Sequence, residues 1–128
     1  MLKLQPANWI TLPILTQFFM EVETLIIVET SLRIEEIFEF LKTWMTRNSE
    51  TVQIEMPEFW FTEILESMGA VLVDEVVLNG ITCSLLPGYG YLLEDTSGNR
   101  TKKVLAYYGG DNMLIFTTKF QLGKGSHA

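Results

Sequence analysis

Histidine and cysteine are almost missing from this sequence, and their scarcity excludes several kinds of active centre. The 128 residues contain one histidine, His127, and one cysteine, Cys83. A single cysteine cannot form an intramolecular disulfide, and a catalytic thiol requires a base such as histidine beside it. Because His127 is next to the last residue, we interpret Cys83 as a buried and inert thiol. We expect no metal site and no cofactor.

The sequence also lacks the glycine spacing of a nucleotide-binding loop. Gly88, Tyr89 and Gly90 begin a GxG pattern, but position 93 is leucine, and strand-like residues follow where a helix is needed. A phosphate-binding loop needs glycines that lead into a helix N-terminus. We find no catalytic constellation elsewhere in the chain, and we therefore favour a function other than catalysis.

A long apolar run is missing as well. The longest uncharged stretch near the start, residues 4–20, is interrupted by Pro6, Asn8, Pro13 and Gln17. A membrane-spanning helix needs about 20 predominantly apolar residues, and a signal peptide needs a compact apolar run before small residues at a cleavage site. Neither pattern fits, so we expect a cytoplasmic protein that does not associate with membranes.

Positive charge is scarce and unevenly distributed. The formal net charge is −7, and residues 1–98 hold 15 of the 16 acidic residues but four of the nine basic ones. An acidic body repels phosphates, which argues against nucleic acid as a partner. Hydrophobic residues still make up 48% of the chain, and the mean hydropathy is +0.21. This composition excludes a disordered chain and favours an apolar interface with a partner.

The order of the predicted elements indicates an α+β fold. Residues 23–30 and 51–56 predict strands, and the apolar spacing of residues 31–45 and 57–68 predicts amphipathic helices, the first with Ser31 as its N-cap. About five antiparallel strands follow. We therefore predict two amphipathic helices packed on a mainly antiparallel sheet with a C-terminal β-meander. We expect a single domain over residues 1–122 and a flexible tail over residues 123–128.

Two local signals refine the C-terminal half. Asn79 and Gly80 between apolar runs predict a two-residue hairpin turn, which places Leu78 opposite Ile81. The apolar alternation changes phase at residues 74–75, and such a shift predicts a bulge or a break in the strand.

Aromatic residues give the best functional indication. The adjacent rings of Phe59, Trp60 and Phe61 cannot all face the core from one helix, and neither can those of Phe38 and Phe40. Some rings should therefore face solvent, where aromatic side chains are favoured interface anchors. We predict a non-catalytic protein-interaction or regulatory module that self-associates as a homodimer or binds a protein partner. Phe40, Phe59 and Trp60 are its candidate interface residues.

One alternative is a small-molecule-binding or enzymatic domain with a pocket near Asp74, Glu75 and Tyr89. Two acids interrupt an otherwise apolar strand at this position, and a bulge can re-aim side chains toward a site.

A weaker alternative is contact with nucleic acid through Arg100, Lys102 and Tyr108, which share one face of a predicted strand. A true binding platform would carry more cations with aromatic rings between them. A charged strand end that blocks edge-to-edge association explains these residues better.

Overall fold

The computed structural model describes residues 1–85, 88–95, 101–109 and 111–122, and this part of the chain contains three helices and two β-sheets. The α+β class predicted from the sequence is confirmed. The elements in chain order are β1 (Leu2–Leu4), α1 (Leu12–Phe18), β2 (Thr24–Ile27), α2 (Ile34–Met45), β3 (Thr51–Glu55), α3 (Glu58–Ser67), β4 (Val71–Leu72), β5 (Glu75–Leu78), β6 (Ile81–Ser84), β7 (Gly90–Asp95), β8 (Lys102–Tyr108), β9 (Met113–Thr117) and β10 (Gln121–Leu122).

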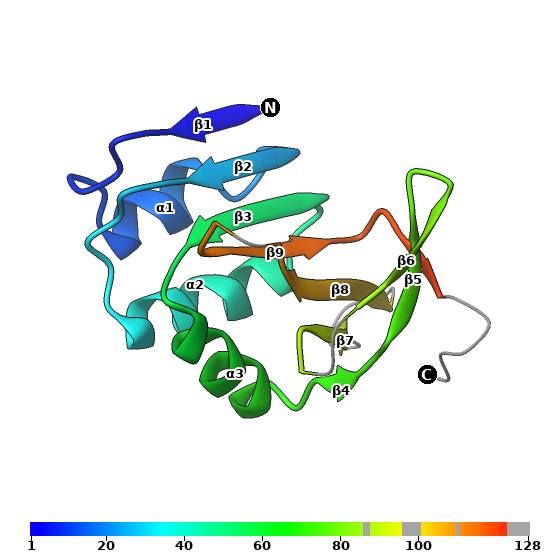
Figure 1. Cartoon of the computed structure of the whole chain (residues 1–128). Coiled ribbons are helices and arrows are strands. Elements are labelled where there is room, and N and C mark those ends of the chain that lie inside the picture. The colour runs from blue at the N-terminus through cyan, green and yellow to red at the C-terminus, as the bar shows by residue number, and fades with distance from the viewer. Residues whose placement is uncertain (86–87, 96–100, 110, 123–128) are drawn as a thin grey trace.

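The large sheet has seven strands in the order β1-β2-β3-β9-β8-β7-β4 (Figure 1). β1, β2 and β3 pair in parallel, and the remaining pairs are antiparallel. The strands β7, β8 and β9 form a consecutive antiparallel meander within this sheet. The large sheet is therefore mostly antiparallel, and its parallel portion consists of β1, β2 and β3 at one edge.

The three helices lie on one side of the large sheet (Figure 1) and share one hydrophobic core with it. α2 buries several large side chains because it contacts both α1 and α3 besides covering the sheet. The ring of Trp44 meets that of Phe116 on β9 edge to face, with the centroids 6.0 Å apart. Phe61 on α3 meets Tyr91 on β7 in the same way at 5.6 Å. Such pairs stabilise a core beyond the area that they bury.

The second sheet has the order β10-β5-β6 and covers the other face of the large sheet near β7 and β8. The large sheet has a hydrophobic core on each face, and alternate side chains of β7 contribute to each. Tyr91 and Leu93 belong to the helix-facing core, whereas Leu92 packs with Val76 of β5 in the other core. The chain passes from one sheet to the other between β4 and β5. This crossover confirms the strand break predicted at residues 74–75.

The hairpin predicted at Asn79 and Gly80 is also confirmed. Both residues have positive φ, 53° and 78°, as this turn requires, and Leu78 pairs with Ile81. Gly69, with φ 72°, follows the end of α3 in the left-handed conformation that closes many helices.

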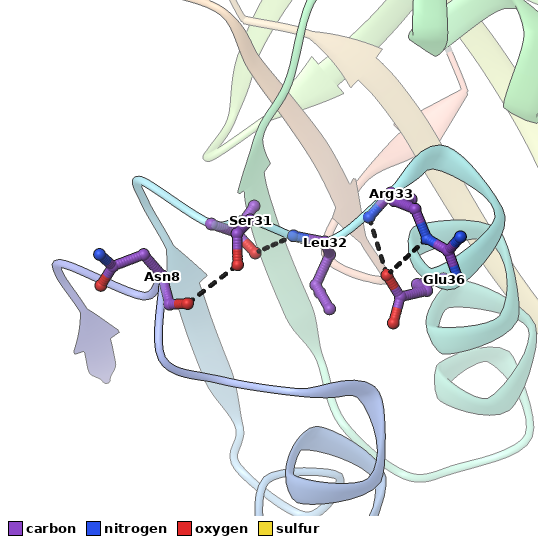
Figure 2. Close-up of polar contacts among 6 residues, drawn as sticks. Asn8, Ser31, Leu32, Arg33 and Glu36 are labelled. Atoms are coloured by element: carbon purple, nitrogen blue, oxygen red, sulfur yellow. Dashed lines mark hydrogen bonds and ion pairs between the residues drawn. The ribbon is translucent and has the colours of Figure 1, made fainter.

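Three predictions need correction. The structure has a third helix, α1, which begins beside a proline at its first turn, a position where the missing amide is tolerated. Ser31 is not the N-cap of α2, because that helix begins after Arg33 and the Ser31 hydroxyl donates to the backbone oxygen of Asn8 (Figure 2). The antiparallel strands also divide between two sheets instead of one. The expected tail at 123–128 lies outside the described residues.

Candidate functional site

The structure separates the three predicted interface aromatics. The ring of Phe40 is fully buried in the helix-facing core, so the expectation that it faces outward is wrong. The reason is that α2 has neighbours on both flanks and buries more than a single stripe. Phe59 is 71% exposed, whereas Trp60 is half-buried and meets the Phe59 ring edge to face at 6.3 Å.

Lys102 is a structural cation that holds the end of α2. Its ammonium group donates to the backbone oxygens of Trp44 and Arg47 at 3.1 and 2.8 Å, and it lies 3.8 Å from the centre of the Trp44 ring. Cations near the C-terminus of a helix stabilise its unpaired carbonyl groups. Burial lowers the pKa of Lys102 to about 8, and nearby Asp95 opposes this change. Arg100 lies outside the described residues.

The tyrosines near the start of α3 form an internal cluster. The Tyr108 hydroxyl shares its one hydrogen between the Met56 backbone oxygen at 3.2 Å and the Asn112 Oδ1 at 2.9 Å. Its ring stacks on that of Tyr89 at 6.2 Å, and the Tyr89 hydroxyl donates to the Glu58 carboxylate. This hydrogen bond to Glu58 raises the pKa of Tyr89. Both hydroxyl groups therefore have hydrogen-bond partners within the chain.

The acids of the proposed alternative pocket lie at the crossover between the sheets. Asp74 follows Val73, whose amide donates to the Gly90 backbone oxygen, and the Asp74 backbone oxygen accepts from Leu85. Glu75 is half-buried and begins β5. The backbone hydrogen bonds of Val73 and Asp74 account for the break in the strand.

The carboxyl ends of the parallel strands are a second place to look for a site, because open α/β sheets bind ligands there. In this protein the carboxylate of Glu36, a residue of the first turn, occupies the start of α2. Glu36 accepts from the Arg33 backbone amide at 3.0 Å and from its side chain at 3.4 Å (Figure 2). The backbone hydrogen bond lowers the pKa of Glu36, and the Arg33 side chain adds to the effect. A carboxylate already lies where an anionic ligand would bind.

The outer side of α2 and α3 offers a more open site. Two adjoining hollows of about 350 and 410 Å³ lie along these helices and share Phe38 and Ser67 in their walls. We call this feature the α2–α3 groove. The end of β7 lines the hollow that contains Met45 from the last turn of α2. Its apolar lining consists of Ile34, Phe38, Met45, Ile64, Met68 and Leu93.

The rims of the α2–α3 groove are acidic. Five acidic residues line it from three elements, and Lys42 is the single basic side chain among the lining residues. The Glu94 carboxylate pairs with Lys103 on the other face of the sheet and adds no charge to the rims. The Lys42 ammonium lies 3.3 Å from Glu39 and 4.9 Å from the centre of the Phe38 ring. The Lys42 ammonium therefore lies over the ring of Phe38, a residue that both hollows share. The five acidic lining residues are Glu35, Glu39, Glu63, Glu94 and Asp95.

Sequence reasoning missed this groove, although one signal was visible. Phe38 has charged neighbours one turn away at Glu35 and Lys42, which indicates the edge of an apolar stripe and not its centre. Assembly of the groove also needs α3 and the end of β7, whose positions beside α2 depend on packing.

The described residues contain no group of three histidine, cysteine or acidic side chains placed to hold a metal ion. No helix in this part of the chain has the length and apolar character to span a membrane. Comparison with protein-family models, with curated proteins and with solved structures finds no match. The candidate site is therefore identified from the structure of this chain alone.

Proposed function

We propose that this protein is a non-catalytic interaction module that binds a segment of a partner protein in the α2–α3 groove. The observation that carries this proposal is Phe38, a half-buried aromatic ring at the point shared by the two hollows. Aromatic anchors in partly enclosed apolar sites provide much of the energy of protein recognition.

The polar groups of the groove support binding over catalysis. Glu35, Glu39 and Glu63 are exposed to solvent. A catalytic carboxylate usually depends on burial or a close charge to tune its proton affinity. Exposed acids around an apolar floor are the arrangement of an interface, with an apolar centre and a polar rim.

The test is selection of binding peptides from an unbiased display library of 16-residue sequences. Wild-type protein is the target, and the Phe38→Asp variant is the decoy. We expect selected peptides to lose at least about 30-fold in affinity on Phe38→Asp, the size of effect typical of a central anchor. The milder Phe38→Ala variant should lose affinity in the same direction, and circular dichroism checks that both variants fold.

Phe59→Asp is the matched control for this selection. Phe59 is an exposed aromatic residue at the start of α3 that lies outside the groove. Its replacement should leave binding of the selected peptides within about twofold of wild type. If the library yields no peptide that depends on Phe38, the proposed function is wrong.

Self-association is a second candidate function, and the exposure of Phe59 favours it. A side chain of this size that is 71% exposed is a suitable anchor for a second copy of the chain. Light scattering at two protein concentrations should show a dimer that Phe59→Ser converts to a monomer. A strictly monomeric wild-type protein at the higher concentration would exclude this candidate.

A further inference from the structure

The charges around the α2–α3 groove indicate the chemistry of its ligand. We infer that the groove binds a basic amphipathic helix of a partner protein, an inference that rests on the proposed function. An apolar stripe on that helix would contact Phe38 and its neighbours, and lysine or arginine side chains would meet the acidic rims.

The length of the groove suits a short helix. Its α2 wall runs from Ile34 to Met45, a rise of about 17 Å at 1.5 Å per residue. A docked helix commonly uses anchors at positions i, i+3 or i+4, and i+7. These anchors span about 10 Å, so the groove is long enough to hold three of them.

Acidic side chains flank the apolar floor on more than one side. Glu35 and Glu39 lie on α2, and Glu63 faces them from α3. Asp95 lines the groove from the end of β7, whereas the Glu94 carboxylate pairs with Lys103 on the opposite face of the sheet. A basic helix would meet carboxylates along both edges, whereas an acidic helix would be repelled along both. Charge complementarity of this kind selects partners by sign.

Lys42 opposes a basic ligand in the free protein. Its ammonium lies over the Phe38 ring and pairs with Glu39. A lysine or arginine of the partner can replace Lys42 at Glu39, and an apolar partner residue can then contact the Phe38 ring. Removal of the Lys42 charge should therefore strengthen binding, although most interface truncations weaken it.

Three synthetic peptides test the inference directly. Each is a 14-residue helix with the same leucine stripe, and the polar face carries lysine, glutamine or glutamate. Binding is measured by fluorescence anisotropy near 150 mM salt, which screens distant charges. We expect the lysine peptide to bind at least about tenfold more tightly than the glutamine peptide, because several rim contacts each contribute a fraction of this factor. Amide chemical shifts should change along α2 and α3.

Two variants on α3 distinguish the groove from general attraction to an acidic protein. Glu63 lines the groove, whereas Glu66 lies on the same helix outside its lining. Glu63→Lys should weaken binding of the lysine peptide about fivefold, and Glu66→Lys less than about twofold. On α2, Lys42→Gln should tighten binding of the same peptide about threefold. The three substituted positions are exposed, so we expect all three variants to fold.

Each outcome bears on a different claim. Equal binding of the lysine and glutamine peptides in the groove would overturn the basic-helix inference and leave the proposed function standing. Equal losses for Glu63→Lys and Glu66→Lys would also overturn it, because the attraction would then be non-local. Failure of all three peptides to bind, or shifts confined to other surfaces, would count against both the inference and the proposed function.

Discussion

Helix α2 borders two surfaces that differ in how their charged and polar groups are arranged. At its start, beside the carboxyl ends of the parallel strands, the polar groups bond to one another. Glu36 accepts from Arg33, and Ser31 donates to Asn8 (Figure 2). Along its flank, the acids of the α2–α3 groove surround an apolar floor, with Lys42 as the one cation among the lining residues. Open α/β sheets bind ligands beside the carboxyl ends of their parallel strands, but the groove that we propose as the binding site is the second surface.

The difference shows how a strand–helix–strand unit can have a closed carboxyl edge. Side chains that cap a helix remove the unpaired amides that would otherwise attract an anion. Apolar side chains have no such internal partner, so an open apolar groove keeps its capacity to bind. Substitutions at each surface should therefore affect different properties, namely stability at the capped start of α2 and binding along its flank.

The largest effect on stability should come from Lys102, which anchors the end of α2 beside the groove. Lys102→Ala removes a hydrogen bond to the Trp44 carbonyl of α2, another to the Arg47 carbonyl just after the helix, and a cation–π contact with Trp44. We expect a loss of about 2 kcal/mol in the free energy of unfolding, measured by urea denaturation. Peptide binding should also weaken, because Met45 in the last turn of α2 lines the groove.

Lys103→Ala is the control for this prediction. Lys103 points to the opposite face of β8 and forms an exposed ion pair with Glu94 at 3.8 Å. Pairs of this kind contribute little, so the expected loss is less than about 0.5 kcal/mol. Equal losses for the two variants would mean that Lys102 does not anchor α2.

Features that depend on neighbouring residues could be predicted from the sequence. The hairpin at Asn79 and Gly80 and the strand break at residues 74–75 are of this kind, because turn chemistry and side-chain alternation are local. The main helices and strands followed from apolar spacing. α1 was missed because its short uncharged segment contains Pro13, which is tolerated only near the helix start where it lies.

The errors in the candidate site have a common physical origin. Ser31 has the local chemistry of an N-cap, but its hydroxyl bonds to Asn8, which is 23 residues away. The sequence does not indicate that Phe40 is more deeply buried than Phe38. The packing of α1 and α3 beside α2 nevertheless buries Phe40 fully. The groove likewise depends on long-range packing, which the apolar pattern of one helix does not determine.

The smallest predicted effects compare two neighbouring acids in the first turn of α2. Glu36→Ala removes the bond to the Arg33 amide and should lower the melting temperature by a few degrees, with peptide affinity unchanged. Glu35→Ala should weaken peptide binding and leave the melting temperature unchanged, because Glu35 lines the groove.

The pH dependence of unfolding sharpens the same comparison. The folded pKa of Glu36 lies below its ordinary value of 4.5, so the unfolded chain binds more protons as the pH falls below that value. The stabilisation from Glu36 is complete above pH 4.5 and is lost as the pH falls through the folded pKa. Thermal unfolding should therefore depend less on acid in Glu36→Ala than in wild type. Identical acid profiles for Glu36→Ala and wild type would show that Glu36 does not stabilise the start of α2, and the contrast with the groove would then fail.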